Sequence, residues 1–344
     1  MPTPSVPSTP PTRTRAWHLV ARPVGEPTPA DFALRPLDLP PVGPGELLVR
    51  NTHFSVDPYM RGRMGTTPGH AYFPPYPLDE PLVGHALGEV LVSRSPDVAV
   101  GEHVVHFAGW REHAVVPADT VTRIEPGPVP LTAHLGVLGM TGLSAYVALF
   151  DIASFRPGDT VFVSGAAGAV GGQVGRMARL AGAARVIGSA GTDEKVRLLL
   201  EDGFDAAFNH RRGPVLDQLA QAAPKGVDVC VDTVGGAHLE AAIRVMNEHG
   251  RIALCGAISQ YNDVEDAPGP SGLAQAIGKR LTLRGMIVTD HEDVLPRFVE
   301  EVGGWVGSGA LRHRETFVDG IENGVGAFLG LFRGDNVGKT LVRL

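Results

Sequence analysis

The segment that most constrains this chain is an apolar strand pattern that runs directly into a glycine-rich turn and then into a helix pattern. Asp159–Ser164 is typical of a buried strand, and Gln173–Ala181 is typical of a helix. Between them the glycines are spaced Gly-x-x-Gly-x-x-Gly, where the commoner pattern is Gly-x-Gly-x-x-Gly. Without side chains in the turn, backbone N–H groups can approach a pyrophosphate, and the helix N-terminus adds the positive end of its dipole. We therefore expect a dinucleotide site, although the same glycines would also allow plain helix-on-sheet packing. The expected contacts are Gly165, Ala166, Ala167, Gly168, Ala169, Val170 and Gly171.

The residues at the end of the next strand indicate whether the dinucleotide is NADH or NADPH. An NAD site places an acidic residue there, about 20 residues further on, to bind the ribose hydroxyls. This chain has Gly188–Gly191 instead, and Asp193 and Glu194 come later, in the first turn of a predicted helix, where the helix dipole accounts for them. The missing acid leaves room for a phosphate, so we predict NADPH over NADH. Basic side chains follow that could bind this phosphate, although surface solvation would explain many of them. They are Lys195, Arg197, His210, Arg211 and Arg212.

Two kinds of pattern divide the 344 residues, a length that suggests two domains at about 100–200 residues each. Residues 14–130 contain short apolar runs separated by Pro and Gly, which is typical of a small all-β barrel. From residue 131 to 311, helices alternate with short apolar strands, which predicts an α/β domain with a doubly wound parallel sheet. We expect residues 312–344 to return to the first domain. The predicted strands of the α/β domain are Val161–Val163, Arg185–Ile187, Val227–Val231, Arg251–Leu254 and Thr282–Met286.

Composition and charge exclude several classes of function. The formal net charge of −7 argues against nucleic acid as the main partner, because phosphate binding needs a basic face. Cys230 and Cys255 alone are too few for a disulfide framework or a cysteine-rich zinc site, and they fit a reduced, cytoplasmic setting. Residues 1–13 are rich in Pro, Ser and Thr, and we expect a disordered tail there, not a secretion signal. The charge-poor stretch Pro126–Phe150 is broken by Pro and Gly, so we expect no membrane span.

Six motifs spread along the chain carry a resemblance to a known family. They are Val56-Asp-Pro-Tyr-Met-Arg61, Gly139-Met-Thr-Gly-Leu-Ser-Ala-Tyr146, Ser164-Gly-Ala-Ala-Gly-Ala-Val-Gly171, Gly191-Thr-Asp-Glu-Lys195, Cys255-Gly-Ala-Ile-Ser-Gln-Tyr-Asn262 and Gly334-Asp-Asn-Val-Gly-Lys339. Together they resemble the medium-chain dehydrogenase/reductase superfamily, and within it the zinc-free branch of prostaglandin, alkenal and curcumin reductases. The resemblance implies a GroES-like β-barrel catalytic domain, a Rossmann domain that binds NADPH, and a homodimer.

The resemblance also implies roles for individual residues. Lys195 would bind the 2′-phosphate of NADPH, Asn336 would contact its nicotinamide end, and Tyr59 would line the substrate pocket. Without a ligand, Lys195 would simply be an exposed helix lysine, and Asn336 would be a turn asparagine.

Some positions depart from the family pattern. Relatives often carry tyrosine where this chain has His210, asparagine where it has Thr233, and proline where it has Thr141. We still expect His210, Thr233 and Cys255 to border the cofactor, with its affinity altered by the first two. Cys255 ends an apolar strand and is better explained as a small buried residue than as a nucleophile.

The chemistry that this residue set supports is a reduction without metal. Zinc-dependent relatives use a cysteine, a His-Glu pair and a further ligand, whereas here His85 has no acid beside it and no cysteine precedes Cys230. Hydride addition to the β-carbon of an α,β-unsaturated ketone or aldehyde needs only hydrogen-bond donors at the resulting enolate oxygen. Tyr261 follows a strand at the edge of the sheet where such ligands bind, so it is our candidate catalytic residue. Alternatively, Tyr261 is a loop residue that only caps the pocket.

Two other functions stay open at this point. An NADPH quinone reductase would use the same hydride donor and the same metal-free site. A non-catalytic NADPH-binding protein with a structural or regulatory role would keep the fold without the chemistry, because fold does not guarantee function.

Overall fold

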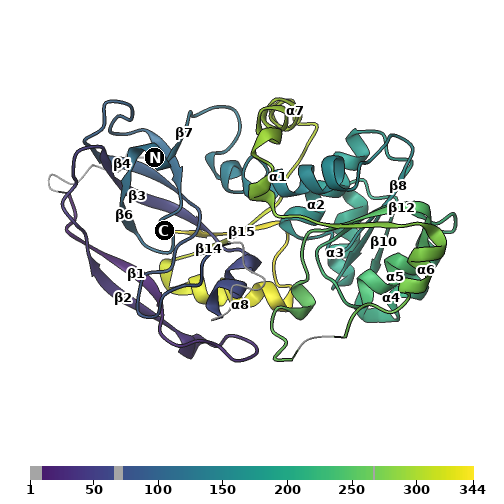
Figure 1. The fold of residues 1–344 in the computed structure, drawn as a ribbon. Helices are drawn as coiled ribbons and strands as arrows, with labels where there is room; N and C mark the ends of the chain where they lie inside the picture. Colours follow the sequence, from purple (N-terminus) through teal and green to yellow (C-terminus); the bar gives the residue numbers. More distant parts are fainter. Residues whose placement is uncertain (1–9, 66–72, 266–267) are drawn as a thin grey trace. The chain divides into compact units, whose positions relative to one another are not determined.

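The structure is a computed structural model that describes residues 10–65, 73–265 and 268–344 (Figure 1). Residues 1–9 of the expected tail lie outside these ranges, and strand β1 begins at Arg13, the last residue assigned to that tail. Within the described ranges, none of the helices has the length and apolar character needed to span a bilayer.

Contacts along the chain define two compact units. Unit 1 contains the residues up to Leu135, Phe317–Arg333 and Thr340–Leu344. Unit 2 contains Gly136–Thr316 and Gly334–Lys339. The sequence analysis expects the whole C-terminal segment to return to the first domain. The short stretch 334–339 instead belongs to unit 2.

The centre of unit 2 is a six-stranded sheet with the order β10-β9-β8-β11-β12-β13, in which the paired strands are parallel. Numbered along the chain within this unit, the order is 3-2-1-4-5-6, the doubly wound arrangement of a Rossmann fold. The strands are β8 Thr160–Val163, β9 Arg185–Ala190, β10 Ala206–Asn209, β11 Val227–Asp232, β12 Met246–Leu254 and β13 Thr282–Gly285.

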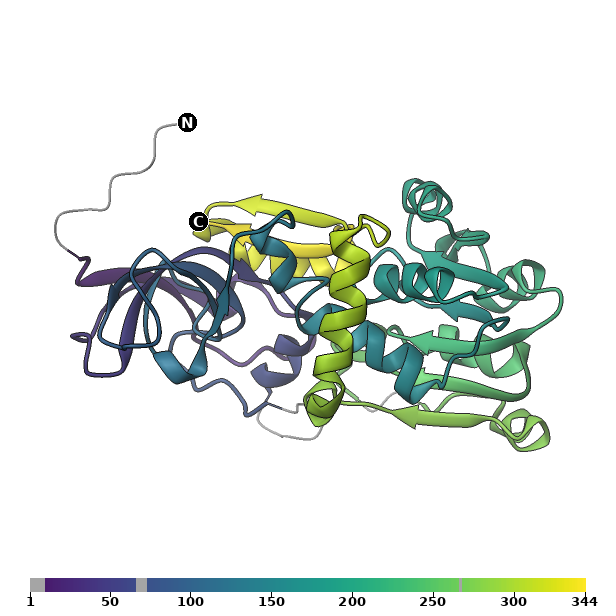
Figure 2. The same ribbon diagram turned by 90° about the horizontal axis from the view of Figure 1, so that it is seen from above.

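Helices lie on both faces of this sheet, which explains why the central strand β8 carries an unbroken apolar run at its end. Helices α1 and α2 pack together on one side, and α4, α5 and α6 pack in sequence on the other (Figures 1 and 2). Val161, Phe162 and Val163 are all completely buried as a result. The helices are α1 Met140–Tyr146, α2 Ala169–Leu180, α3 Asp193–Glu201, α4 Val215–Ala222, α5 Ala237–Val245, α6 Leu273–Lys279 and α7 Leu295–Gly307.

Unit 1 is built mainly from antiparallel strands. Strand β3 pairs antiparallel with β4, β6 and β15, and β1 pairs antiparallel with β2. The strands are β1 Arg13–Leu19, β2 Phe32–Asp38, β3 Glu46–Ser55, β4 Ala86–Ser93, β5 His103–His106, β6 His113–Pro117, β7 Thr122–Ile124, β14 Glu315–Asp319 and β15 Lys339–Arg343. The chain passes from unit 2 into unit 1 within both β14 and β15.

The core of unit 1 is aromatic. Helix α8, Gly324–Arg333, places Phe328 against Trp110, with ring centroids 6.3 Å apart, and Trp110 in turn contacts Phe54 at 5.0 Å. All three side chains are fully buried. Residues from near both ends of the described chain therefore share one core.

Candidate functional site

The glycine turn lies between β8 and α2, as the sequence predicts. Gly165 has a φ of 57°, and a Cβ there would lie 2.8 Å from the Thr233 hydroxyl oxygen. A Cβ on Gly171 would lie 2.6 Å from the Gly165 carbonyl oxygen. These positions must be glycine, because the turn folds tightly on itself. Residues 167–170 remain partly exposed at the start of α2, where a helix has backbone N–H groups without acceptors inside the helix. The turn thus fits a bound pyrophosphate.

A buried polar network under the turn holds it to the neighbouring strand β11. The Ser164 hydroxyl donates to Asp232 Oδ1 at 2.5 Å, and the Thr233 backbone N–H donates to the Ser164 hydroxyl oxygen at 2.8 Å. The Thr233 hydroxyl donates to the Ser164 carbonyl oxygen at 3.0 Å. Burial raises the pKa of Asp232, although the hydrogen bonds it accepts oppose this shift. Thr233 therefore acts on the turn through its hydrogen bonds to Ser164.

Lys195 stands in the first turn of α3, directly after strand β9. The Thr192 hydroxyl caps this helix by accepting from the Lys195 backbone N–H. The Lys195 ammonium donates to the Gly334 carbonyl oxygen at 2.5 Å, and the residue is only 9% exposed. Burial lowers the pKa of Lys195, and the nearby carboxylate of Asp335 partly opposes this. The side chain is thus a buried cation at the end of β9, where the sequence predicts the 2′-phosphate.

His210 lies in a short 3₁₀ turn, His210–Arg212, after strand β10. Its ring packs edge-to-face on the ring of His238, with centroids 5.1 Å apart. Burial, together with the charge of Arg211, lowers the pKa of His210. Burial also lowers the pKa of His238, to about 4. Both imidazoles are therefore neutral at pH 7, in a region that already holds Lys195 and Arg211.

Tyr261 and Cys255 lie just after strand β12. The Tyr261 hydroxyl oxygen accepts from the Ala257 backbone N–H at 3.2 Å, and burial raises the pKa of Tyr261. Tyr261 thus stays a phenol at neutral pH and keeps its proton for donation. Burial raises the pKa of Cys255 to about 12, so this thiol is not a nucleophile at neutral pH.

The segment 334–339 carries Asn336 and runs beside the glycine turn. The Gly338 backbone N–H donates to the Ala167 carbonyl oxygen at 2.8 Å, and the Asn336 side-chain amide donates to the Gly338 carbonyl oxygen at 2.9 Å. The Thr316 hydroxyl donates to the Val337 carbonyl oxygen, and its oxygen accepts from the Val337 N–H. Hydrogen bonds therefore connect the turn, Asn336 and Lys195 within unit 2.

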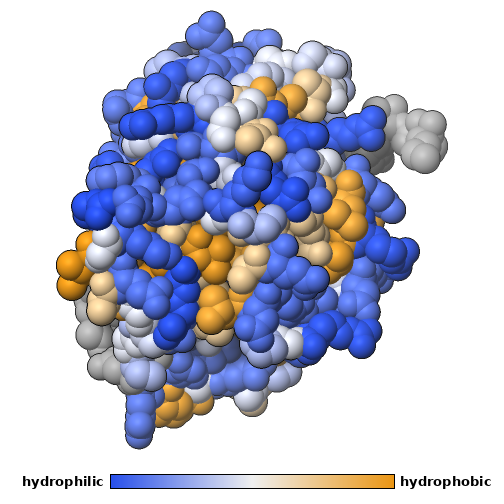
Figure 3. Space-filling view, turned by 90° about the vertical axis from the view of Figure 1, so that its right-hand side faces the viewer, coloured by the Kyte–Doolittle hydropathy of each residue, from blue (hydrophilic) through white to orange (hydrophobic). Residues whose placement is uncertain are grey.

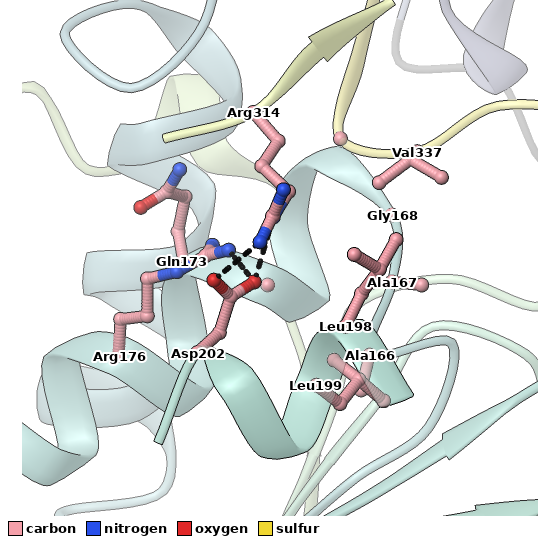
Figure 4. A pocket seen from close by; sticks show the side chains of 12 residues that line it. Ala166, Ala167, Gly168, Gln173, Arg176, Leu198, Leu199, Asp202, Arg314 and Val337 are labelled. Atoms are coloured by element: carbon pink, nitrogen blue, oxygen red, sulfur yellow. Dashed lines mark hydrogen bonds and ion pairs between the residues drawn. The ribbon is translucent and has the colours of Figure 1, made fainter. Parts of the chain in front are cut away.

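An ion cluster that the sequence analysis missed lies behind the turn (Figure 4). Arg314 donates two hydrogen bonds of 2.9 Å to the Asp202 carboxylate, which also pairs with Arg176. These side chains and Gln173 line a small hollow together with the turn residues. The partners lie 26 and 112 residues apart in sequence, so no local pattern indicates that they meet.

Tyr59 belongs to unit 1, in the 3₁₀ helix Pro58–Met64. Its ring lies 5.2 Å from the ring of Phe73, which lies 5.2 Å from that of Phe107. The His85 ring packs edge-to-face on Phe107 at 4.9 Å. All four rings are partly exposed, and together they form an aromatic wall suited to an apolar ligand.

Comparison with known proteins identifies the family to which this chain is similar. A family model described as the N-terminal domain of oxidoreductase matches residues 15–124, and one described as zinc-binding dehydrogenase matches residues 169–302. NADPH-dependent curcumin reductase of Escherichia coli (strain K12) is 38% identical over 96% of this chain and 97% of its own length. Prostaglandin reductase 1 of Sus scrofa is 37% identical over 96% of this chain and 99% of its own length. The crystal structure of CurA from Vibrio vulnificus in complex with NADPH has a TM-score of 0.89 at 37% identity, covering 96% of this chain and 98% of that chain.

One of these family descriptions names zinc, but the donor side chains in the described part of the chain do not fit a zinc site. Across the described ranges, no group of three His, Cys, Asp or Glu side chains is placed to share a metal ion. His85 stands between Gly84 and Ala86, neither of which offers a ligand side chain, and its ring packs on Phe107. On its residues, its fold and its relatives, this chain belongs to the medium-chain dehydrogenase/reductase superfamily, in the zinc-free branch of prostaglandin and alkenal reductases.

Proposed function

We propose that this protein uses NADPH to reduce the carbon–carbon double bond of α,β-unsaturated ketones and aldehydes. The observation that carries the proposal is the partly exposed N-terminus of α2. It follows a turn in which there is no room for further side chains, and the turn follows a strand of a parallel sheet with the strand order of a Rossmann fold. Curcumin, prostaglandin and 2-alkenal reductases among the relatives supply the substrate class. NADPH, when bound, supplies the hydride.

The residues proposed to hold NADPH contact different parts of the cofactor. Backbone N–H groups of residues 165–171 bind the pyrophosphate, and Lys195 binds the 2′-phosphate, with His210 beside it. Asn336 contacts the nicotinamide end, while Thr233 and Cys255 border the site. Support for Lys195 comes from its buried ammonium, which stands just after the end of β9.

Tyr261 is the proposed catalytic residue. As hydride adds to the β-carbon, negative charge moves to the carbonyl oxygen, and a phenol can stabilise that charge by hydrogen bonding. The α-carbon must then receive a proton, which a protonated tyrosine can donate directly or through water. Burial raises the pKa of Tyr261, so the hydroxyl carries its proton at working pH and can donate a hydrogen bond to the enolate oxygen. Tyr59 and its aromatic wall are proposed to bind the apolar part of the substrate.

The first experiment follows NADPH consumption with enals, enones and simple quinones, with NADH in parallel and products identified by mass. Saturated carbonyl products, formed with NADPH in preference to NADH, are expected. Hydroquinones as the only products would identify a quinone reductase, and NADPH binding without any turnover would identify a binding protein.

A second experiment tests Tyr261. Tyr261→Phe keeps the ring and removes the proton, so kcat is expected to fall by about 10²-fold or more while the Kd for NADPH stays within a few-fold. Phe73→Tyr, in the wall proposed to bind the apolar part of the substrate, is a matched aromatic control, and it should alter KM more than kcat. Wild-type turnover in Tyr261→Phe would remove the catalytic role.

We also propose a cytoplasmic homodimer. Strand β13 is the last strand in the order of the parallel sheet, and most of its residues are exposed. Helix α6 beside it exposes Leu273 and Ile277, the latter 80% exposed. Apolar patches are visible among hydrophilic side chains on the face seen in Figure 3. A second copy would cover such an edge, and light scattering that gives twice the chain mass is the expected result.

A further inference from the structure

The bond between Lys195 and Gly334 joins two parts of the proposed NADPH site that serve opposite ends of the dinucleotide. Lys195 is the residue proposed for the 2′-phosphate, and its ammonium donates to the Gly334 carbonyl at 2.5 Å. Gly334 begins the segment 334–339, which carries Asn336, the residue proposed for the nicotinamide end. The lysine is buried, so its position is fixed by the protein around it.

Helix α3 is attached to this segment at both ends. At its first turn, Lys195 binds Gly334, the first residue of the segment. At its C-cap, Asp202 binds Arg314, whose carbonyl oxygen accepts from the Lys339 N–H at 2.9 Å. A change at the N-terminus of α3 therefore acts on the segment at Gly334, while the far end stays anchored.

A displacement of Gly334 would also move Asn336, because the two residues are close in sequence. Asn336 is two residues from Gly334, and its side chain is bonded to the Gly338 carbonyl. Gly338 is bonded to the glycine turn through Ala167, and a Cβ on Gly338 would lie 2.0 Å from the Arg314 carbonyl oxygen. The Gly338 end is therefore rigidly packed, and Gly334 is the end that can respond.

We propose that Lys195 is a positioning residue as well as a phosphate ligand: one ammonium bonds the 2′-phosphate and the Gly334 carbonyl together, and so orders the segment that carries Asn336. This inference rests on the proposed function. An ammonium has three donors, so it can hold both oxygen atoms at once. The charges that face it are Arg211, which repels it, and Asp335 and Glu194, which attract it. A bound phosphate would fix the ammonium, and with it Gly334, against the competing pull of Asp335. NADPH would then differ from NADH in the placement of Asn336 and not only in affinity.

The test uses a ligand that lacks the nicotinamide end. Adenosine 2′,5′-bisphosphate and adenosine 5′-monophosphate are each added at saturation to the full chain, and amide hydrogen exchange of 334–339 is measured by mass spectrometry. In the wild type, the bisphosphate is expected to slow exchange in this segment several-fold, and the monophosphate is expected to leave it unchanged. Because neither ligand reaches the nicotinamide end, the response must travel through the protein.

Two variants separate coupling from affinity. Lys195→Met is expected to bind the bisphosphate more weakly and to show no slowing of 334–339 even at saturation. Arg211→Met removes a cation whose charge acts on Lys195, so it should weaken binding yet keep the slowing at saturation. Lys195→Arg retains donors and charge and is expected to restore part of the response, which excludes simple unfolding as its cause.

The outcomes test the coupling through Lys195 separately from the proposed function. Unchanged exchange in the wild type under saturating bisphosphate would overturn the coupling, as would equal slowing in saturated Lys195→Met. Absence of any binding of NADPH to the wild type would overturn the proposed function itself. In turnover, the coupling predicts a lower kcat with saturating NADH than with saturating NADPH, and Lys195→Met should abolish that difference.

Discussion

The glycine turn and the segment 334–339 lie side by side, bonded through Ala167 and Gly338, yet they are held in place in opposite ways. The turn keeps its shape because side chains are missing at Gly165 and Gly171, so that backbone packs directly on backbone. In the segment, backbone packing of this kind is confined to the Gly338 end, and polar side chains from α3 and β14 hold Gly334 and Val337. Gly165 and Gly171 are thus sensitive to added atoms, whereas Gly334 and Val337 are sensitive to the loss of a charge or a hydroxyl elsewhere.

Adding a side chain to the turn should have the largest effect. Gly171→Val would place its Cβ 2.6 Å from the Gly165 carbonyl oxygen and 2.9 Å from the Ala166 Cα. Neither atom belongs to a flexible side chain, so the turn itself must move. We expect the free energy of unfolding to fall by about 3 kcal/mol, at the upper end for overpacking, and NADPH affinity to fall by about 100-fold. Calorimetric titration and thermal unfolding measure the two effects.

A second glycine in the same unit serves as the control. Gly303 lies inside helix α7, and a Cβ there would have no atom within 4 Å. Gly303→Ala is expected to stabilise the protein by about 0.5–1 kcal/mol, because alanine is the better helix former, and to leave NADPH binding unchanged. Equal losses of affinity in both variants would contradict the assignment of the turn.

The same contrast explains how far the sequence alone could predict this structure. The apolar run next to the glycines predicts β8 with nearly correct bounds, but α2 begins at Ala169, four residues before the predicted start at Gln173, because Ala169–Gly172 of the glycine-rich stretch are already helical. Strand β10, Ala206–Asn209, was not among the predicted strands, because two alanines and an asparagine give no strand signal and the strand forms by pairing with β9. The role of Arg314 was missed for a related reason: its partner Asp202 is 112 residues away, and only the fold brings them together.

Removing the charge of Arg314 should release the far end of the segment. Arg314→Met deletes both hydrogen bonds to Asp202 but leaves Arg176 to neutralise the carboxylate. Because the Arg314 side chain is 37% exposed, we expect a loss of about 1–2 kcal/mol in the free energy of unfolding, below the full value for such bonds. NADPH affinity should fall by about tenfold at most, through the segment. Urea titration measures the first effect.

Arg179 provides the matched control for Arg314. Arg179 makes hydrogen bonds of 3.0 and 3.1 Å to Asp205, but its side chain is half exposed. Arg179→Met is expected to cost less than about 1 kcal/mol and to leave cofactor binding unchanged. If Arg179→Met weakened NADPH binding as much as Arg314→Met, general charge and not the segment would be responsible.

The dependence on pH should distinguish the two halves of the site further. Burial opposes the ionisation of Asp202, but the hydrogen bonds from Arg314 and the charge of Arg176 outweigh it and lower the pKa of Asp202. A lowered carboxylate pKa contributes stability above the unfolded value of about 3.9, and this contribution is lost as the pH falls below that value. The difference in unfolding free energy between wild type and Asp202→Asn should therefore be constant from pH 7 to 5 and shrink below about pH 4. The difference between wild type and Gly171→Val should show no such change, since no titrating group is involved.

The smallest expected effect tests whether hydroxyls also hold the segment. The Thr316 hydroxyl donates to the Val337 carbonyl at 2.7 Å and accepts from the Val337 N–H at 3.1 Å, so one oxygen satisfies both backbone groups. Thr316→Val keeps the shape of the side chain and removes both hydrogen bonds, which should lower the free energy of unfolding by about 1 kcal/mol. Thr316→Ser keeps the hydroxyl and should cost distinctly less. Hydrogen exchange at 334–339 is the sharper readout, because it should rise in Thr316→Val while exchange in the glycine turn stays at its wild-type rate. A parallel rise in the turn would mean that the two regions form one cooperative element, and that the contrast between backbone packing and side-chain anchoring does not separate them.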